Sequence, residues 1–185
     1  MQFNMKKIGR KIADLRKAQN LTQMNLADQM GISYQAVSNW ERGETMPDIS
    51  KLPELAAIFD CSIDDILGSP RASEVVEYVT GGNAPAEAIT GEEVLDLAPL
   101  LEPQTTERLI EESGQGKEVA AFKVHDLVEF APFVESSFLG EQLLKSPLEV
   151  LTAHILAQAA PFLDEEHLDL IADRLLASGQ KVCLD

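Results

Sequence analysis

The stretch from Thr22 to Gly43 constrains the fold most, because it holds two short helical segments with residues suited to begin and end each of them. Thr22 is placed to cap a helix over 22–30, and Gly31 supplies the turn, since glycine adopts the left-handed conformation at a helix end most easily. Ser33 is placed to cap the next helix, which Gly43 ends. Two short helices joined by a tight glycine turn predict a helix-turn-helix.

Apolar residues at helical spacing supply a core for this segment. A first helix precedes Thr22 and is expected to end at Gln19 and Asn20. The residues expected to face the core are Ile8, Ile12 and Leu15 in the first helix, Leu26, Ala27 and Met30 in the second, and Val37 and Trp40 in the third.

Charge is unevenly distributed along the chain, whose formal net charge is -16. Residues 1–68 hold eight Lys or Arg against nine Asp or Glu, whereas residues 69–185 hold seven against twenty-two. The basic residues of the opening segment, opposed there by Asp14 alone, are Lys6, Lys7, Arg10, Lys11, Arg16 and Lys17. Taken alone, they also fit a solvated helix face. They are enough positive charge for a phosphate backbone if the acidic part is held away.

Residues 8–68, "IGRKIADLRKAQNLTQMNLADQMGISYQAVSNWERGETMPDISKLPELAAIFDCSIDDILG", resemble the phage-repressor-like helix-turn-helix domain of bacterial regulators, the xenobiotic-response-element class. The motifs "LTQ", "LA", "GIS", "VSNWERG" and "LAAIFDCSIDDIL" occur in order. The resemblance implies five helices, with the fourth near 50–58 and the fifth near 63–67. It also implies a recognition helix in the DNA major groove, and a structural pair between Glu41 and an arginine at the place of Arg10.

The third helix carries the candidate base-reading residues on its outward side. These are Tyr34, Gln35, Ser38 and Asn39. Amide side chains pair bidentately with the exposed edge of adenine, and a tyrosine ring can contact a thymine methyl group. The alternative for this set is ordinary solvent exposure.

The residues expected to hold DNA phosphates, which position a domain without reading sequence, are Gln23, Ser33, Arg42 and Arg10. Only Arg42 among the arginines lies on the recognition helix, so one module is expected to bind weakly. A symmetric homodimer would place two recognition helices one turn of DNA apart, about 34 Å. Some members of this fold bind protein instead of DNA.

An internal repeat marks the acidic part of the chain. The motifs "LAPLLE" (97–102), "FAPFVE" (130–135) and "AAPFLD" (159–164) recur at intervals of 33 and 29 residues. Each unit is predicted to be a helix, a proline break and a second helix, with the two apolar residues after the proline packed against the core. Glu102, Glu135 or Asp164 then stands at a helix start, which favours negative charge. Such hairpins are expected to stack, because one alone cannot bury its apolar face.

We therefore expect an all-α protein with a five-helix domain over 1–68, a linker over 69–90 that contains "GGNAP", and an acidic array of about three helical hairpins over 91–185. A short helix is possible at Glu74–Val79 within the linker. Capping boxes are expected at Thr90 with Glu93, and at Ser146, Pro147 and Glu149. The repeats resemble uncharacterised helical repeats of bacterial proteins, which implies no activity.

Motifs for catalysis and metal binding are absent from the sequence. Cys61 and Cys183 have no partner at metal-like spacing, and His125, His154 and His167 have no Cys or His at i+3 or i+4. There is no phosphate-cradling glycine loop and no nucleophile elbow. An enzyme, a cofactor and a metal site are not expected. No apolar run approaches the roughly 20 residues that span a bilayer, so a cytoplasmic protein is expected.

These observations favour a sequence-specific transcriptional regulator that binds double-stranded DNA as a dimer, with the repeats mediating oligomerisation or receiving a signal from a protein partner. The alternative is a protein-interaction adaptor or antitoxin-like protein, in which the repeats are the main binding surface. A third possibility is a regulator that senses a small apolar ligand within the repeats, although no residue points to such a ligand.

Overall fold

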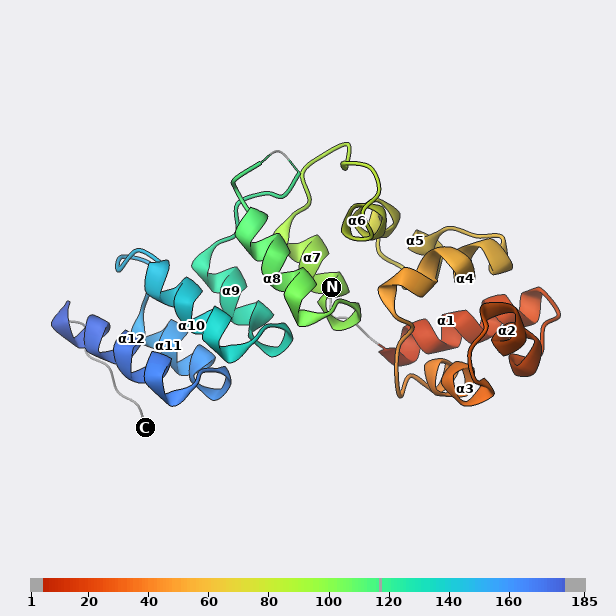
Figure 1. Cartoon of the computed structure of the whole chain (residues 1–185), viewed down its shortest axis with the longest axis horizontal. Helices are drawn as coiled ribbons and strands as arrows, with labels where there is room; N and C mark the ends of the chain where they lie inside the picture. The colour runs from red at the N-terminus through yellow and green to blue at the C-terminus, as the bar shows by residue number, and fades with distance from the viewer. Residues whose placement is uncertain (1–4, 117, 179–185) are drawn as a thin grey trace. The chain divides into compact units, whose positions relative to one another are not determined.

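A computed structural model describes residues 5–116 and 118–178, which are helical apart from their connections (Figure 1). Their elements are α1 (Met5–Ala18), α2 (Gln23–Met30), α3 (Tyr34–Arg42), η1 (Ile49–Lys51), α4 (Leu52–Phe59), α5 (Ile63–Leu67), α6 (Ala72–Val79), α7 (Gly91–Leu97), η2 (Ala98–Leu100), α8 (Pro103–Glu112), α9 (Val124–Phe130), η3 (Ala131–Phe133), α10 (Ser136–Lys145), α11 (Ala153–Ala159), η4 (Ala160–Phe162) and α12 (Glu165–Ala177). No strand forms within these two ranges, and Ile89 and Val119 make one isolated bridge. The all-α prediction is confirmed.

The described residues form two compact units. The first runs to Glu87 and includes Pro99–Leu101, and the second holds Ala88–Ala98 and the residues from Glu102 onward. No helix in the described part of the chain is both long enough and apolar enough to cross a membrane.

The helix ends of the first unit lie where the sequence places them. The Thr22 hydroxyl accepts a hydrogen bond from the Asn25 amide at 3.0 Å, and the Ser33 hydroxyl accepts one from the Ala36 amide at 3.1 Å. Gly31 and Gly43 end α2 and α3 with φ of 62° and 68°, the left-handed region in which a side chain would be strained. These caps set the turn that orients α3.

Close contact between α1 and α3 holds the first unit together. A Cβ added at Gly9 would lie 2.2 Å from the carbonyl oxygen of Trp40, so the backbones of the two helices meet at this point. Ile8 and Ile12 of α1 are buried, and so are Val37 and Trp40 of α3. Further buried side chains come from α2, α4 and α5, namely Leu26, Met30, Leu52, Leu55, Phe59 and Ile66.

Helix α6 lies within the segment predicted as a linker. Its Val75 and Val76 are buried, and the Ser73 amide donates a hydrogen bond to Asp64 Oδ1 of α5 at 2.7 Å. The sequence left a short helix open at Glu74–Val79; the helix forms, and it begins two residues earlier, at Ala72. Much of the segment after α5 is therefore packed onto the first unit.

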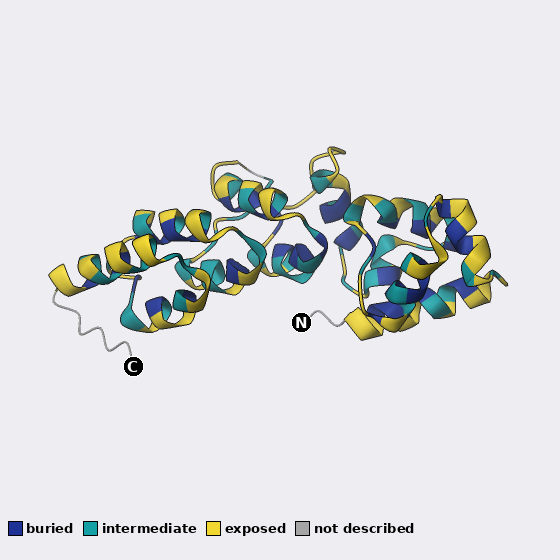
Figure 2. Cartoon of the chain, turned by 60° about the horizontal axis from the view of Figure 1, so that its bottom comes forward, coloured by how far each residue is buried: buried dark blue, intermediate teal, exposed yellow. Residues whose placement is uncertain are grey.

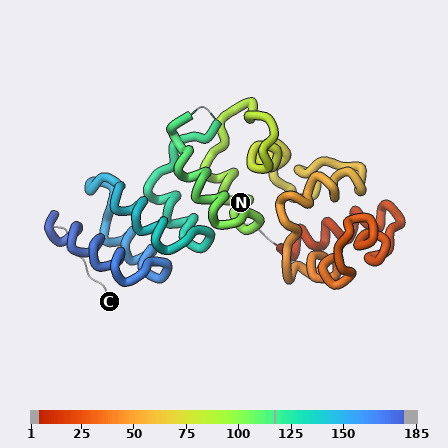
Figure 3. Tube along the Cα trace, viewed as in Figure 1, coloured from red at the N-terminus to blue at the C-terminus, as the bar shows by residue number. Residues whose placement is uncertain are grey.

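The three proline motifs share one local structure, although Pro99–Leu101 of the first motif belongs to the first unit. Each proline motif falls in a short 3-10 helix (η2, η3 or η4) between two α-helices, and Glu102, Glu135 and Asp164 stand at the N-caps of α8, α10 and α12. Figure 3 follows the course of the backbone through these segments. The Asp164 side chain accepts a hydrogen bond from the His167 amide at 2.9 Å. The last two of these helix pairs contribute to one apolar core, formed by Ala131, Leu139, Leu143, Leu151, Leu156, Ala159, Ile171 and Leu175.

Two local predictions for the second unit are wrong. Ser146 opens no helix: it follows α10, and its hydroxyl donates to the Gln142 carbonyl at 2.9 Å, while Thr152 caps α11. The apolar residues after each proline are also not all packed inward, because Phe162 is 40% exposed. The capping box at Thr90 and Glu93 does form.

Candidate nucleic-acid interface

Helix α3 presents a polar edge to solvent. Tyr34 is 47% exposed and Gln35 is exposed, whereas Asn39, one turn further on, is half-buried. The Gln35 side-chain amide donates a hydrogen bond to Asn39 Oδ1 at 2.8 Å, which holds the two amides side by side. The remaining donors and acceptors of the two amides are the groups that could meet a base edge.

Ser38 and Arg42 are placed differently from the other predicted residues of α3. Ser38 is only 8% exposed, and its hydroxyl accepts a hydrogen bond from the Arg42 guanidinium. Arg42 also donates to Asn39 Oδ1 at 2.6 Å and pairs with Glu44 at 2.8 Å. The hydrogen bond between Arg42 and Glu44 raises the pKa of the guanidinium and lowers the pKa of the carboxyl. Arg42 therefore links the edge of α3 to an acidic residue.

The N-terminal ends of α2 and α3 carry two of the predicted phosphate-binding residues. Ser33 is exposed at the N-cap of α3, and its hydroxyl can still donate while it accepts from Ala36. Gln23 is partly buried, and its side-chain amide donates to Glu41 Oε2 at 2.8 Å. Helix N-termini favour anions, because their first amides lack partners within the helix.

Glu41 pairs with Arg16, which corrects the expected pair with Arg10. Arg16 Nε lies 2.5 Å from Glu41 Oε1, and Nη2 lies 3.0 Å from Oε2. The two side chains are 9% and 8% exposed. Burial raises the pKa of Glu41, but hydrogen bonds from Arg16 and Gln23 outweigh it and hold that pKa below its ordinary value.

Helical geometry explains why Arg16 takes this role. Ile8, Ile12 and Arg16 follow one another at intervals of four residues, so they share the buried face of α1 that packs on α3. Arg10 lies two residues after Ile8, roughly 200° around the helix, and is exposed. The spacing of four residues from Ile8 to Ile12 to Arg16 is the signal in the sequence that indicates Arg16 as the partner of Glu41.

The helix-turn-helix and its buried ion pair lie within one family domain. Residues 12–66 match the family model described as helix-turn-helix, and this range contains the capped α2–α3 pair and the Arg16–Glu41 bridge. Residues 12–66 are a helix-turn-helix domain of the phage-repressor-like class.

Relatives of the helix-turn-helix domain include repressors and an activator. The chain is 39% identical over 73 residues to the cryptic phage CTXphi transcriptional repressor RstR of Vibrio cholerae, covering 40% of this chain and 65% of that protein. It is 34% identical over 83 residues to the HTH-type transcriptional activator BcrR of Enterococcus faecalis, covering 45% and 38%. It is 33% identical over 76 residues to Repressor protein C2 of Salmonella phage P22, covering 41% and 35%.

The alignments span less than two thirds of the length of these relatives. No solved structure matches the chain. The family model is that of a helix-turn-helix, and these relatives are named as transcriptional repressors and an activator, which is the class that the sequence predicts for this domain.

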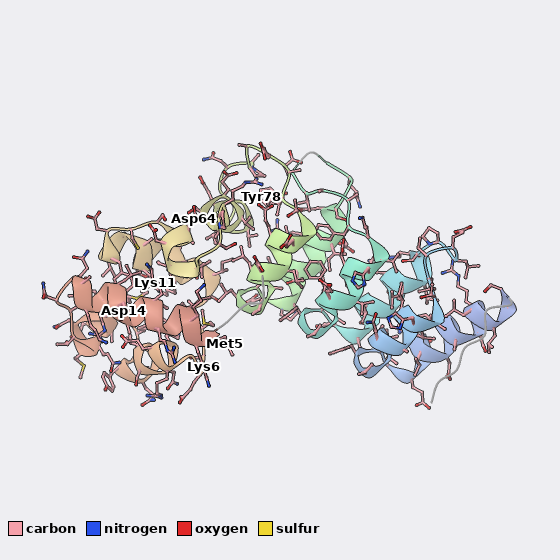
Figure 4. All side chains as sticks on the ribbon, turned by 180° about the vertical axis from the view of Figure 1, so that it is seen from behind. Met5, Lys6, Lys11, Asp14, Asp64 and Tyr78 are labelled. Atoms are coloured by element: carbon pink, nitrogen blue, oxygen red, sulfur yellow. The ribbon has the colours of Figure 1, made fainter. Side chains whose placement is uncertain are left out.

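Basic residues of α1 extend the surface of the helix-turn-helix domain. A groove of about 540 Å³ between α1 and α5 is lined by Lys6, Lys7, Arg10 and Lys11, and Figure 4 labels two of these lysines along α1. Lys6 and Arg10 also line a second groove, of about 580 Å³, with Arg42. The structure therefore brings Arg10 near Arg42, at the C-terminal end of α3.

The remaining candidates for chemistry belong to elements other than α2 and α3. His125 and His154 are exposed, whereas His167 is partly buried with its Nδ1 2.8 Å from Asp164. No group of three or more His, Cys, Asp or Glu residues within 5–116 and 118–178 could hold a metal ion. Burial raises the pKa of the Cys61 thiol, and Cys183 lies outside the described residues.

Proposed function

We propose that this protein is a cytoplasmic, sequence-specific transcriptional regulator that binds an inverted-repeat DNA operator as a homodimer. The hydrogen-bonded amide pair of exposed Gln35 and half-buried Asn39 on α3 is the observation that carries the proposal. A buried or apolar edge at this place could not read a base. Asn39 Oδ1 accepts hydrogen bonds from both Gln35 and Arg42, which leaves Gln35 Oε1 to accept from N6 of adenine and the Asn39 side-chain NH2 to donate to N7.

The roles of individual residues follow from their placement. Tyr34, Gln35 and Asn39 are proposed to contact bases. Ser38 has its hydroxyl engaged by Arg42, so we assign it the smaller role of orienting that guanidinium. The proposed phosphate contacts are Gln23, Ser33, Arg42 and Arg10. Gln23 would shift its amide from Glu41 to a phosphate, or bridge the two.

The dimer is proposed because one domain offers few contacts. Arg42 is the single arginine of the recognition helix, so the affinity of one domain is expected to be low. Two domains related by a twofold axis would read two half-sites about 34 Å apart. The repeat segment is then available for oligomerisation or for a protein partner, and its negative charge disfavours contact with DNA.

Removing the amide pair tests this proposal. The duplex is first obtained by selection from a random pool, and its affinity is measured by fluorescence anisotropy for the wild type and for Gln35→Ala with Asn39→Ala. We expect the double variant to lose about 100-fold or more in affinity, because each bidentate contact contributes about 1–3 kcal/mol. Ser50→Ala, an exposed polar change in η1, is the matched control and should leave the affinity unchanged.

The competing function is a protein-interaction adaptor. It is favoured by the seven basic against twenty-two acidic residues of 69–185, which suit a basic partner. If no duplex is enriched, or if the double variant binds the duplex as tightly as the wild type, the DNA proposal fails and the adaptor is preferred.

A further inference from the structure

The connection between the first and second hairpins is longer than the connection between the second and third. The helices on either side match in length, because α8 and α10 have 10 residues each and α9 and α11 have 7 each. The connections span 113–123 and 146–152. The four residues by which the first motif interval of 33 exceeds the second interval of 29 therefore lie in 113–123. Insertions between repeats fall in loops on one face, which is often the binding face.

The longer connection lines a groove of about 650 Å³ within the second unit. Its Ser113, Gln115 and Phe122 line this groove together with residues near the C-terminal ends of α8 and α10. All of the lining residues belong to the second unit. Sites for small organic molecules have volumes of about 300–1,000 Å³, so the groove is large enough to hold one.

The apolar part of the groove is held in place by its neighbours. It includes Ile110, Phe122, Val124 and Leu127. Phe122 is only partly buried, and its ring stacks on Phe130 with the two centroids 5.5 Å apart. A Cβ added at Gly91 would lie 3.3 Å from the same ring, so the start of α7 packs against it as well. A ring fixed in this way offers a preformed apolar surface to the body of a ligand.

Positive charge gathers at this groove although the unit around it is acidic. The described residues of the second unit hold four Lys or Arg against eighteen Asp or Glu. Two of the four, Arg108 and Lys145, line the groove from α8 and α10. Both are exposed, and Figure 2 shows how exposed residues alternate with buried ones along the helices of this unit. Lysine and arginine bind carboxylates through charge-assisted hydrogen bonds, so the groove favours a ligand that carries a carboxylate.

The ion pairs that Arg108 and Lys145 make within the chain are long and exposed. Arg108 Nη1 lies 3.7 Å from Glu112 Oε1, and Lys145 Nζ lies 3.4 Å from Glu141 Oε2. The four side chains are between 38% and 64% exposed, and pairs of this kind contribute little to stability. A ligand carboxylate can therefore replace these partners at low cost. Glu111 also lines the groove and disfavours a second negative charge on the ligand.

We propose that this groove is a binding site for a small organic carboxylate that carries one negative charge on an apolar body. The apolar body would pack on Phe122, and the carboxylate would accept hydrogen bonds from Arg108 and Lys145. Because α8 and α10 belong to different hairpins, the bound ligand would contact two hairpins at once and stabilise their packing. The proposal concerns the second unit alone and does not rest on DNA binding by the first.

Displacement of a fluorescent probe from the full chain tests this proposal. The probe is anilinonaphthalene sulfonate, an aromatic monoanion whose emission rises in apolar sites. The competitors are decanoate, decylamine and decanol, which share one chain length and differ in charge. We expect the probe to bind saturably and decanoate to displace it at a concentration about tenfold lower than decylamine or decanol, because only the carboxylate pairs with Arg108 and Lys145.

Single substitutions locate the site. Arg108→Gln and Lys145→Gln should each weaken decanoate binding about tenfold. Lys123→Gln makes the same charge change between two lining residues, and Lys11→Gln makes it in the basic groove of α1. Both are controls and should change the affinity less than about threefold. Helicity by circular dichroism should be unchanged in every variant.

Three results would overturn the proposal: a probe signal that does not saturate, displacement by decylamine or decanol as effective as by decanoate, or equal effects of Lys145→Gln and Lys123→Gln. A loss confined to Lys11→Gln would also overturn it, because the probe would then occupy the groove of α1. No duplex is present in these titrations, so their outcome leaves the proposed regulator to its own test.

Discussion

Breaking the buried Arg16–Glu41 bridge should strongly destabilise the helix-turn-helix domain. Arg16→Met removes both hydrogen bonds to Glu41 and leaves that carboxylate, 8% exposed, with the Gln23 amide as its hydrogen-bond partner. Loss of one partner of a buried pair costs about 3–5 kcal/mol, because the other charge stays desolvated. Replacing both residues, as Arg16→Met with Glu41→Leu, removes that uncompensated charge. The double variant should therefore lie within about 1 kcal/mol of the wild type.

Trp40 makes this measurement specific to one domain. It is the chain's single tryptophan, is 6% exposed and precedes Glu41 on α3, so its fluorescence during urea unfolding reports the helix-turn-helix domain whatever the second unit does. The exposed Lys51–Glu54 pair is the matched control, and Lys51→Met should cost less than about 1 kcal/mol. A cost for Arg16→Met as small as that of the control, or a double variant less stable than either single variant, would refute the argument.

Three further results are expected. The pKa of Glu41 in the folded protein lies below its ordinary value. Its contribution to stability is therefore present above about pH 4.5 and is lost as pH falls through the folded-state pKa. Glu41→Gln should lose less stability on acidification than the wild type, as measured by Trp40 fluorescence during unfolding. Gly9→Ala should destabilise the domain by about 3 kcal/mol, because the new Cβ meets the backbone carbonyl of Trp40, and wild-type stability for this variant would contradict the packing of α1 on α3. Glu44→Gln releases Arg42 from its ion pair and removes an anion near the proposed phosphate site, so its affinity for the duplex in anisotropy titrations should be higher than that of the wild type. The affinity of Arg42→Ala should be lower than that of the wild type. If both variants bind as tightly as the wild type, Arg42 is not part of the interface.

Much of the first unit was predictable, because its helix ends depend on local chemistry. Thr22, Ser33, Gly31 and Gly43 act within a few residues of their own positions, and the sequence places all of them correctly. The partner of Glu41 was not predictable from the resemblance alone. It depends on which face of α1 meets α3, and only the spacing from Ile8 through Ile12 to Arg16 fixes that face.

The second unit was harder to predict because the burial of its residues depends on which helices pack against each other. Proline reliably marks the 3-10 turns, since it blocks helix continuation locally. Burial after each proline depends on what packs on that corner, so Phe133 and Phe162 differ although their surrounding motifs agree. The Ser146 hydroxyl donates a hydrogen bond to the Gln142 carbonyl at the end of α10 instead of capping a following helix, and Thr152 caps α11. The engagement of Ser38 by Arg42 likewise needed side-chain coordinates.

Discrimination between bases is the most direct test of the claim that the edge of α3 reads DNA. The affinity of the wild type and of Asn39→Ala would be measured for every single-base substitution of the selected duplex. The wild type is expected to lose about 1–3 kcal/mol at particular A·T pairs in each half-site. Asn39→Ala is expected to stop distinguishing the bases at one of these pairs and to keep its preferences elsewhere. A uniform loss of affinity with every preference intact would contradict this expectation.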